Sequence, residues 1–108
     1  MPPKLVESLS SEQVIEISAG EYHTLVINMD GRVLASGSNV SGQLGLGHTE
    51  TQHTFQRVHE LHNILQVSAG EHSAAIDCDG RLYRWGQGVK GIYLAPLKIA
   101  SPRPTFID

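Results

Sequence analysis

The stretch "ISAGEYHTLVINMDGRV", residues 17–33, is followed later in the chain by "VSAGEHSAAIDCDGRL", residues 67–82. Gly20 aligns with Gly70 at a spacing of 50 residues, and the second halves of the two copies align at 49, because the second copy is one residue shorter. Self-similarity at a fixed period of this length indicates a solenoid, a propeller or another repeat array. The content of each copy decides among these architectures.

Each copy is rich in short apolar or alternating runs, which predict strands. Residues 25–27 form an apolar run of the length of a buried strand. Residues 82–85 alternate with a period of two, as a half-buried strand does. Further short strands are expected at residues 14–17, 33–35, 56–58 and 64–67. The competing interpretation is a helical turn near residues 59–63.

Two turn dipeptides, Asp30-Gly31 and Asp79-Gly80, close the expected hairpins. They predict type I′ turns, in which both central residues adopt positive φ. About four short strands then fall in each copy, and four strands make one propeller blade. The predicted fold class is therefore all-β, with propeller blades of four short antiparallel strands.

The pattern "SAGEYHTLVINMDGRVLASGSNVSGQLGLG", residues 18–47, resembles the repeat of the regulator of chromosome condensation family. The shared elements are an Ala-Gly pair, a following histidine, an Asp-Gly turn, a strand-ending glycine and Gly-Gln-Leu-Gly. We expect the matching positions to be structural repeat residues. They are Gly20, His23, Asp30, Gly31, Gly37, Gly42 and Gly45 in the first copy, and Gly70, His72, Asp79, Gly80, Trp85 and Gly86 in the second.

The resemblance implies a division of the chain into repeat units. Residues 1–16 resemble the tail of a preceding unit, residues 17–66 form the first propeller repeat, and residues 67–108 form a second, divergent repeat. The complete fold of the family is a closed ring of seven such units. A chain with about two blades is therefore not expected to close a ring on its own.

The sequence departs from the family pattern in two places. Ser36 stands where the family usually has a tryptophan, before the strand-ending glycine. The second copy lacks Gly-Gln-Leu-Gly and offers only Gly88 and Gly91 as partial echoes, which predicts a shorter or altered outer loop. Trp85 is the only tryptophan, which argues against the light sensing that one plant branch of the family performs with clustered tryptophans.

Composition excludes several classes of partner and environment. The net charge of −3 without a Lys/Arg cluster predicts no nucleic-acid surface. No apolar run approaches the ~20 residues of a membrane helix, and the N-terminus lacks the apolar core of a signal peptide. The single cysteine, Cys78, permits no intrachain disulfide. We expect an intracellular protein, cytoplasmic or nuclear, in which the Asn39-Val40-Ser41 glycosylation sequon has no role.

Histidines are the residues most suggestive of chemistry. Four of them lie within fifteen residues of each other, but zinc needs three or four converging ligands, commonly with cysteines or a His-x₃₋₅-His pair. These are His48, His53, His59 and His62, and we interpret them as solvated loop residues. His23 and His72 recur at matching positions, so a structural role is expected. Each imidazole is predicted to hydrogen-bond backbone near the Ala-Gly turn.

Other catalytic or nucleotide-binding motifs are missing from the sequence. The glycine-rich stretch at residues 37–47 is followed by His48-Thr49-Glu50, whereas a P-loop ends in Gly-Lys-Ser/Thr. No Gly-x-Ser-x-Gly exposes a nucleophilic serine. The sequence therefore assigns no catalytic, cofactor-binding or metal-binding residue and predicts no enzyme and no cofactor.

Three functions remain open. The favoured one is a protein–protein interaction module or scaffold, whose partner is another protein or further propeller blades. The second is part of a guanine-nucleotide exchange factor for a small GTPase, the activity of the family's founding member. That activity uses a surface from several blades, which two units cannot rebuild, and its chromatin contacts favour basic residues, whereas this chain is acidic. The third is a metal-dependent enzyme using the His48–His62 loop.

Overall fold

The chain forms eight strands and no long helix in the part that the computed structural model describes, residues 9, 12–88 and 91–100. The strands are β1 (Val14–Ala19), β2 (His23–Asn28), β3 (Val33–Gly37), β4 (Gln52–Arg57), β5 (Ile64–Ala69), β6 (His72–Asp77), β7 (Leu82–Gly88) and β8 (Gly91–Ala100). The all-β fold predicted from the sequence is confirmed.

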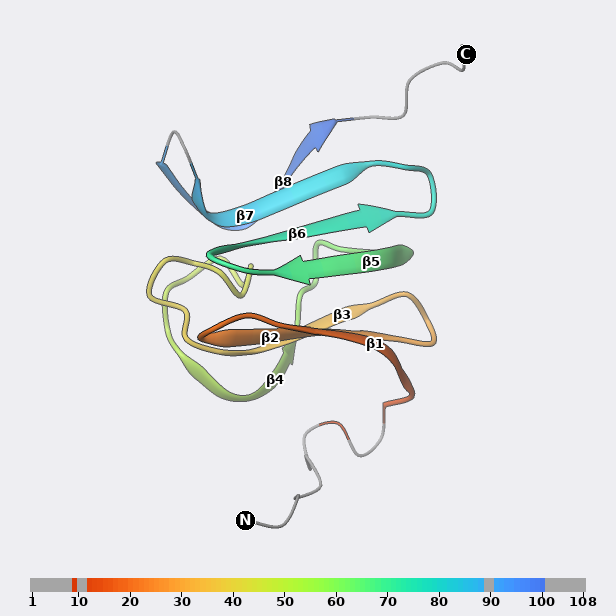
Figure 1. Cartoon of the computed structure of the whole chain (residues 1–108), viewed down its shortest axis with the longest axis horizontal. Helices are drawn as coiled ribbons and strands as arrows, with labels where there is room; N and C mark the ends of the chain where they lie inside the picture. The colour runs from red at the N-terminus through yellow and green to blue at the C-terminus, as the bar shows by residue number, and fades with distance from the viewer. Residues whose placement is uncertain (1–8, 10–11, 89–90, 101–108) are drawn as a thin grey trace.

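Two antiparallel sheets of four strands contain these elements, with strand orders β1-β2-β3-β4 and β5-β6-β7-β8. We call them sheet 1 and sheet 2. Each is a simple up-and-down meander, the arrangement of one propeller blade. The two sheets lie one above the other in Figure 1, where β5 packs against β1 and β2. The pair is not closed into a ring, as the sequence predicts.

An apolar core fills the space between the sheets. Leu25 and Ile27 of β2 are completely buried there, because alternate residues of a strand point to the same face of its sheet. Sheet 2 contributes Val67, Ala75 and the 1%-exposed Trp85. Further buried members come from β3, from the loop after it, from the β4–β5 connection and from the start of β5: Val33, Ala35, Leu44, Val58, Leu61 and Ile64.

The hairpins differ from the type I′ turns that the dipeptides predict. Between β2 and β3, Gly31 N–H donates to Asn28 O at 3.0 Å, and Asn28 N–H donates to Arg32 O at 3.0 Å. Gly31 has a φ of 76°, whereas Asp30 is not among the residues of positive φ. This geometry is a type I turn followed by a left-handed glycine. The β6–β7 hairpin repeats it, so the type I′ prediction was wrong in both copies.

The strand predicted at residues 56–58 overlaps β4, which begins four residues earlier and runs from Gln52 to Arg57. The helical alternative near residues 59–63 is replaced by a tight turn in which Leu61 N–H donates to Val58 O. β8 is the fourth strand of sheet 2, in agreement with the four strands predicted for each blade. It pairs with β7 as far as Gly88↔Gly91, and residues 89–90 of the predicted altered loop lie outside the described residues. The unit boundaries at residues 17 and 67 remain a prediction.

Candidate functional site

A chain of hydrogen bonds joins the two sheets at His23. Its Nε2 lies 2.9 Å from the Ser73 Oγ, although the two residues are 50 positions apart in the sequence. The Ser73 hydroxyl in turn donates to the Gln43 carbonyl at 2.6 Å. His23 is 3% exposed and Ser73 is fully buried. The first strand to follow the Ala-Gly pair of each copy therefore takes part in contact between blades.

Trp85 reaches the same carbonyl from β7. Its indole Nε1–H donates to Gln43 O at 2.8 Å. A Cβ added at Gly45 would lie 2.8 Å from that nitrogen, so the loop approaches the indole as closely as glycine permits. Gly86 lies beside it, with a φ of 90° and an added Cβ 3.2 Å from Gln43 Cα. The Gly-Gln-Leu-Gly motif of one blade thus forms the binding surface for the tryptophan of the next blade, and we call this surface the tryptophan seat.

The two matched histidines have different environments. The predicted hydrogen bond of His23 to backbone was wrong, because its partner is a hydroxyl of the neighbouring sheet. Burial lowers the pKa of His23, since an imidazolium is poorly solvated there. His72 is exposed. It occupies the same position in sheet 2, but the described residues form no further blade on its side, and its structural role remains a prediction.

The outward face of sheet 2, defined as the face turned away from sheet 1, carries the counterparts of the buried interface. Ala74, Ile76 and Leu82 stand at the positions of Leu25, Ile27 and Val33 in the repeat. The latter three are completely buried, whereas Leu82 is 37% exposed.

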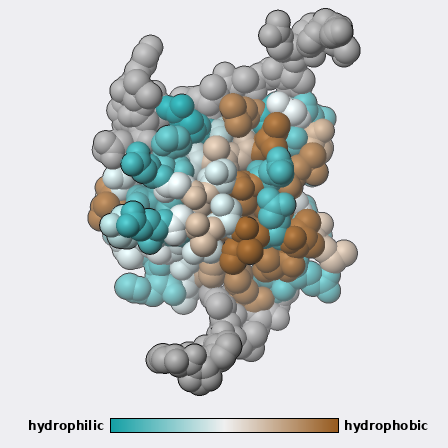
Figure 2. All heavy atoms as spheres, in the orientation of Figure 1, coloured by the Kyte–Doolittle hydropathy of each residue, from teal (hydrophilic) through white to brown (hydrophobic). Residues whose placement is uncertain are grey.

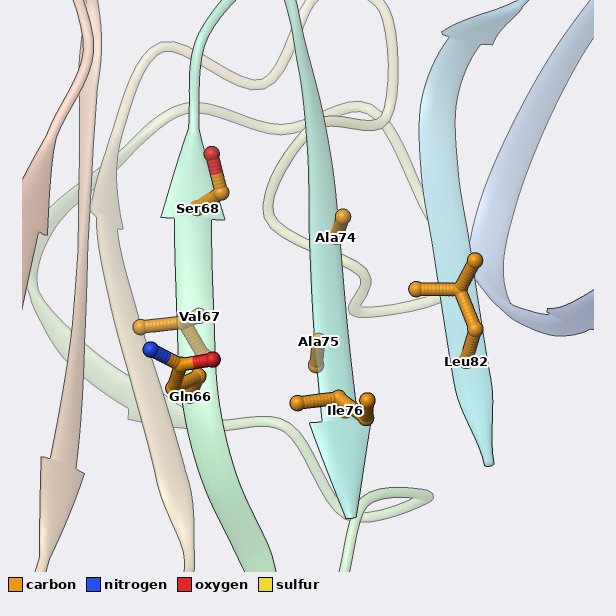
Figure 3. A pocket seen from close by; sticks show the side chains of 7 residues that line it. All are labelled: Gln66, Val67, Ser68, Ala74, Ala75, Ile76 and Leu82. Carbon is orange, nitrogen blue, oxygen red and sulfur yellow. The ribbon is translucent and has the colours of Figure 1, made fainter. Parts of the chain in front are cut away.

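A shallow hollow of about 320 Å³ lies on this outward face (Figure 3). The lining residues come from three adjacent strands, β5, β6 and β7: Gln66, Val67, Ser68, Ala74, Ala75, Ile76 and Leu82. Sheet 1 packs against sheet 2 through the equivalent face of its own strands. The hollow therefore lies on the face of sheet 2 where a further blade would pack.

The opposite outward face, on sheet 1, is open mainly along β1. Ile17 is 63% exposed, although its counterpart Val67 is only 9% exposed against sheet 1. Ile15 is equally exposed, but its counterpart Leu65 remains 59% exposed, so that position does not belong to a blade contact. Figure 2 shows apolar side chains gathered on the side where β5 begins and β6 ends in Figure 1. The outward faces themselves expose Ile17 on sheet 1 and Leu82 on sheet 2.

Two hairpin residues were missed in the sequence. Asn28 Oδ1 accepts the N–H groups of Asp30 (2.9 Å) and Arg32 (3.0 Å). Asp77 Oδ1 accepts those of Asp79 (3.0 Å) and Arg81 (2.8 Å) in the second copy. An Asx residue that bonds its own turn is recognisable from sequence, because Asn or Asp two residues before Asp-Gly recurs in both copies.

Electrostatics distinguish the Asp77 hairpin. Burial on its own raises the pKa of Asp77. The carboxylate is stabilised by hydrogen bonds from the backbone N–H groups of Arg81 and Asp79, from the Tyr83 hydroxyl and from the Arg81 guanidinium. These hydrogen bonds outweigh burial and hold the pKa of Asp77 below its usual range. Arg81 also pairs with Asp79 at 2.8 Å. The predicted repeat residue Asp79 is thus a surface partner, and Asp77 is the buried centre of the turn.

The remaining repeat glycines occupy close approaches or left-handed positions. Gly37 has a φ of 114°, and a Cβ there would lie 2.5 Å from Tyr22 O. Gly20 N–H donates to His23 O at 2.8 Å, and Gly70 N–H donates to His72 O at 3.0 Å, which closes the turn before β2 and β6. Gly42 (72°), Gly45 (75°), Gly47 (87°) and Gly80 (84°) are also left-handed.

The loop of residues 38–51 is organised by Asn39. Its Nδ2 donates to His48 O at 2.8 Å and to Glu50 O at 3.1 Å, while its Oδ1 accepts Leu44 N–H at 2.9 Å. Asn39 is completely buried, so the sequon amide is already engaged inside the fold. Sequence reasoning noted Asn39 only as a sequon and missed this role.

The histidine-rich segment does not assemble into a metal site. Among the described residues, no three His, Cys, Asp or Glu side chains are placed to hold one ion. His48 and His59 line a polar hollow of about 220 Å³ together with Arg57, and His48 Nδ1 accepts Glu50 N–H at 3.1 Å. A guanidinium in that hollow repels a cation. This arrangement gives the metal-dependent hypothesis no support.

Residues 14–43 and 30–76 match the family described as "Regulator of chromosome condensation (RCC1) repeat". The chain belongs to this family. The human X-linked retinitis pigmentosa GTPase regulator is 44% identical over 93 residues, which are 82% of this chain and 9% of that protein. The ultraviolet-B receptor UVR8 of Arabidopsis thaliana is 39% identical over 92 residues, 82% of this chain and 21% of the receptor. The chain thus spans a small part of these relatives.

Solved structures share the fold. Human WBSCR16 superimposes with a TM-score of 0.74 at 24% identity, over 82% of this chain and 26% of that one. Prp20p from Saccharomyces cerevisiae, described with its binding properties to Gsp1p and histones, gives a TM-score of 0.71 at 18% identity, over 85% of this chain and 26% of Prp20p. The two sheets are therefore two propeller blades. No helix in the described residues has the length and apolarity to cross a membrane.

Proposed function

We propose that this pair of blades is a protein–protein interaction module or scaffold whose binding surfaces are the outward faces of its two sheets. The observation that carries this proposal is the hollow beside Leu82, which exposes positions that are buried where sheet 1 meets sheet 2. Exposed apolar surface of this kind marks interaction sites. The partners are another protein or further propeller blades, inside the cell, in cytoplasm or nucleus.

A binding experiment with matched variants tests this. The purified chain is immobilised, proteins retained from native lysate are identified by mass, and each is then titrated in purified form. Leu82→Lys should weaken binding about tenfold or more, because a charge would replace an apolar contact. Leu65→Lys is the control, since Leu65 is 59% exposed at a position outside blade contacts. Partners that bind both variants equally would refute the use of the sheet 2 face.

A contribution to guanine-nucleotide exchange on a small GTPase is the second candidate. It is favoured by a relative whose name is GTPase regulator, and by the binding of Prp20p to Gsp1p. Faster release of labelled nucleotide from a GTPase in the presence of the chain would support it. Two blades present only a fraction of a propeller surface, so we rank it below a scaffold. The described residues offer no constellation for catalysis of their own, and no enzyme activity is proposed.

A further inference from the structure

We propose that the outward face of sheet 2 docks head to tail onto the outward face of sheet 1 of a second copy of this chain. The inference rests on the proposed function and names the occupant of the same faces. It is argued from continuity with the interface between the two sheets, because the hydrogen-bonding residues of that interface and its β5 contact residue Val67 have counterparts on the two outward faces. A second copy supplies these counterparts from β1 and β2 of its sheet 1.

The polar contacts transfer residue by residue. At the existing interface, His23 bonds Ser73, and Ala69 N–H donates to Ser18 Oγ at 2.9 Å. On the outward face of sheet 2, His72 and Ser68 replace His23 and Ser18, and both are exposed. On the outward face of sheet 1, Thr24 replaces Ser73 and Ala19 replaces Ala69. A second copy therefore brings a hydroxyl to His72 and a backbone N–H to Ser68.

The two departures from the repeat pattern complement each other. Trp85 needs the Gly42–Gly45 loop of the preceding blade as its seat. Sheet 2 has no such loop, so a blade that docks on it must lack the tryptophan. Sheet 1 has Ser36 at the position of Trp85. Of the two described blades, the one that lacks a Gly-Gln-Leu-Gly loop therefore matches the one that lacks a tryptophan.

The apolar contact also matches. Ile17 stands at the position of Val67, and Val67 packs into the core between the sheets. In a second copy, Ile17 would enter the hollow beside Ile76 and Leu82. Val26 and Leu34, on the same outward face as Ile17, are already buried. The docking therefore uses the β1 side of sheet 1.

A head-to-tail contact repeats from copy to copy until it closes into a ring or extends as a filament. Each copy adds two blades, and propellers have about four to eight. Closed assemblies of about two to four copies are therefore expected.

Sedimentation of the purified chain over micromolar to millimolar concentrations tests this. Wild type should form assemblies larger than a monomer, and Ile17→Lys or Leu82→Lys should weaken association about tenfold or more. Ile15→Lys is the matched control for Ile17→Lys, because both isoleucines are 63% exposed and only Ile17 has a buried counterpart. Thermal melts of each variant establish that it is folded.

Mixing the variants gives the sharper result. Each of Ile17→Lys and Leu82→Lys keeps one intact face, so the mixture should form a heterodimer and stop there. A wild-type chain that stays monomeric throughout would overturn this inference. So would assembly that tolerates Ile17→Lys, or variants that do not complement each other. If the monomeric chain still bound other proteins through Leu82, the proposed function would stand without this contact.

Discussion

The His23 ring and the Ser73 hydroxyl, 50 residues apart in the chain, meet at 2.9 Å between the two blades. Because Ser73 Oγ donates its one hydrogen to Gln43 O at 2.6 Å, it accepts from His23. The neutral His23 ring must therefore carry its hydrogen on Nε2. The buried Ser73 hydroxyl thus determines the tautomer of His23 and links sheet 1, sheet 2 and the loop that contains Gln43.

Replacing the two repeat histidines should have unequal effects. His23→Ala should lower the free energy of unfolding by about 1–3 kcal/mol, because it leaves a buried hydroxyl short of a partner and removes a packed ring. His72→Ala should change it by less than about 0.5 kcal/mol in the monomer, because that ring is exposed. Urea unfolding of both variants provides the measurement. Equal losses would contradict the environments assigned to the two rings.

Stability should also depend on pH through His23. Burial lowers its native pKa, while the unfolded chain titrates near about 6.5. The unfolded state therefore binds more protons in the window below about 6.5, and stability falls as pH drops through it toward the native pKa. His23→Gln keeps a donor without titrating. The stability difference between wild type and this variant should shrink on acidification from about pH 7 to about pH 5, and a constant difference would argue against a buried neutral ring.

The repeat and the strands were predictable because they depend on local pattern. Apolar runs, period-two alternation and Asp-Gly turns each act within a few residues, so residues 25–27 and 82–85 were found as strands. The turn type was not, because Asp-Gly suits more than one hairpin. Asn28 favours the type I turn with a left-handed glycine, because its Oδ1 accepts the N–H groups of Asp30 and Arg32 within that turn.

The contacts between blades were less accessible from sequence. His23 and Trp85 were identified as repeat residues, but their partners lie 50 and 42 positions away. Repetition shows that a position matters to each unit and does not reveal whether its partner is in the same unit or the next. That ambiguity led to the wrong expectation of a backbone partner for His23. Only the stacked arrangement of the sheets resolves it.

The Asx residues of the two hairpins should respond differently to exchange. Asp77→Asn keeps an oxygen acceptor for the turn, as Asn28 does naturally. Asn28→Asp is worse, because Asn28 Nδ2 donates to Glu12 Oε1 at 2.8 Å and a carboxylate there would face another carboxylate. Thermal melting near neutral pH should rank Asn28→Asp below wild type and below Asn28→Ser, a neutral control. Recovery of Asn28→Asp by Glu12→Gln would locate the effect in this pair, and absence of recovery would contradict it.

A pair of glycine substitutions separates backbone strain from contact with the tryptophan. Gly45 and Gly47 both have positive φ, at 75° and 87°, so alanine at either adds about 1–2 kcal/mol of strain. A Cβ at Gly47 meets nothing within 4 Å, whereas one at Gly45 lies 2.8 Å from Trp85 Nε1. Gly45→Ala should therefore cost about 1–3 kcal/mol more than Gly47→Ala. It should also shift the Trp85 fluorescence toward that of an exposed indole. Equal stability of the two variants with unchanged emission would show that the loop can move away from Trp85 at no cost. It would contradict a close contact between Gly45 and Trp85.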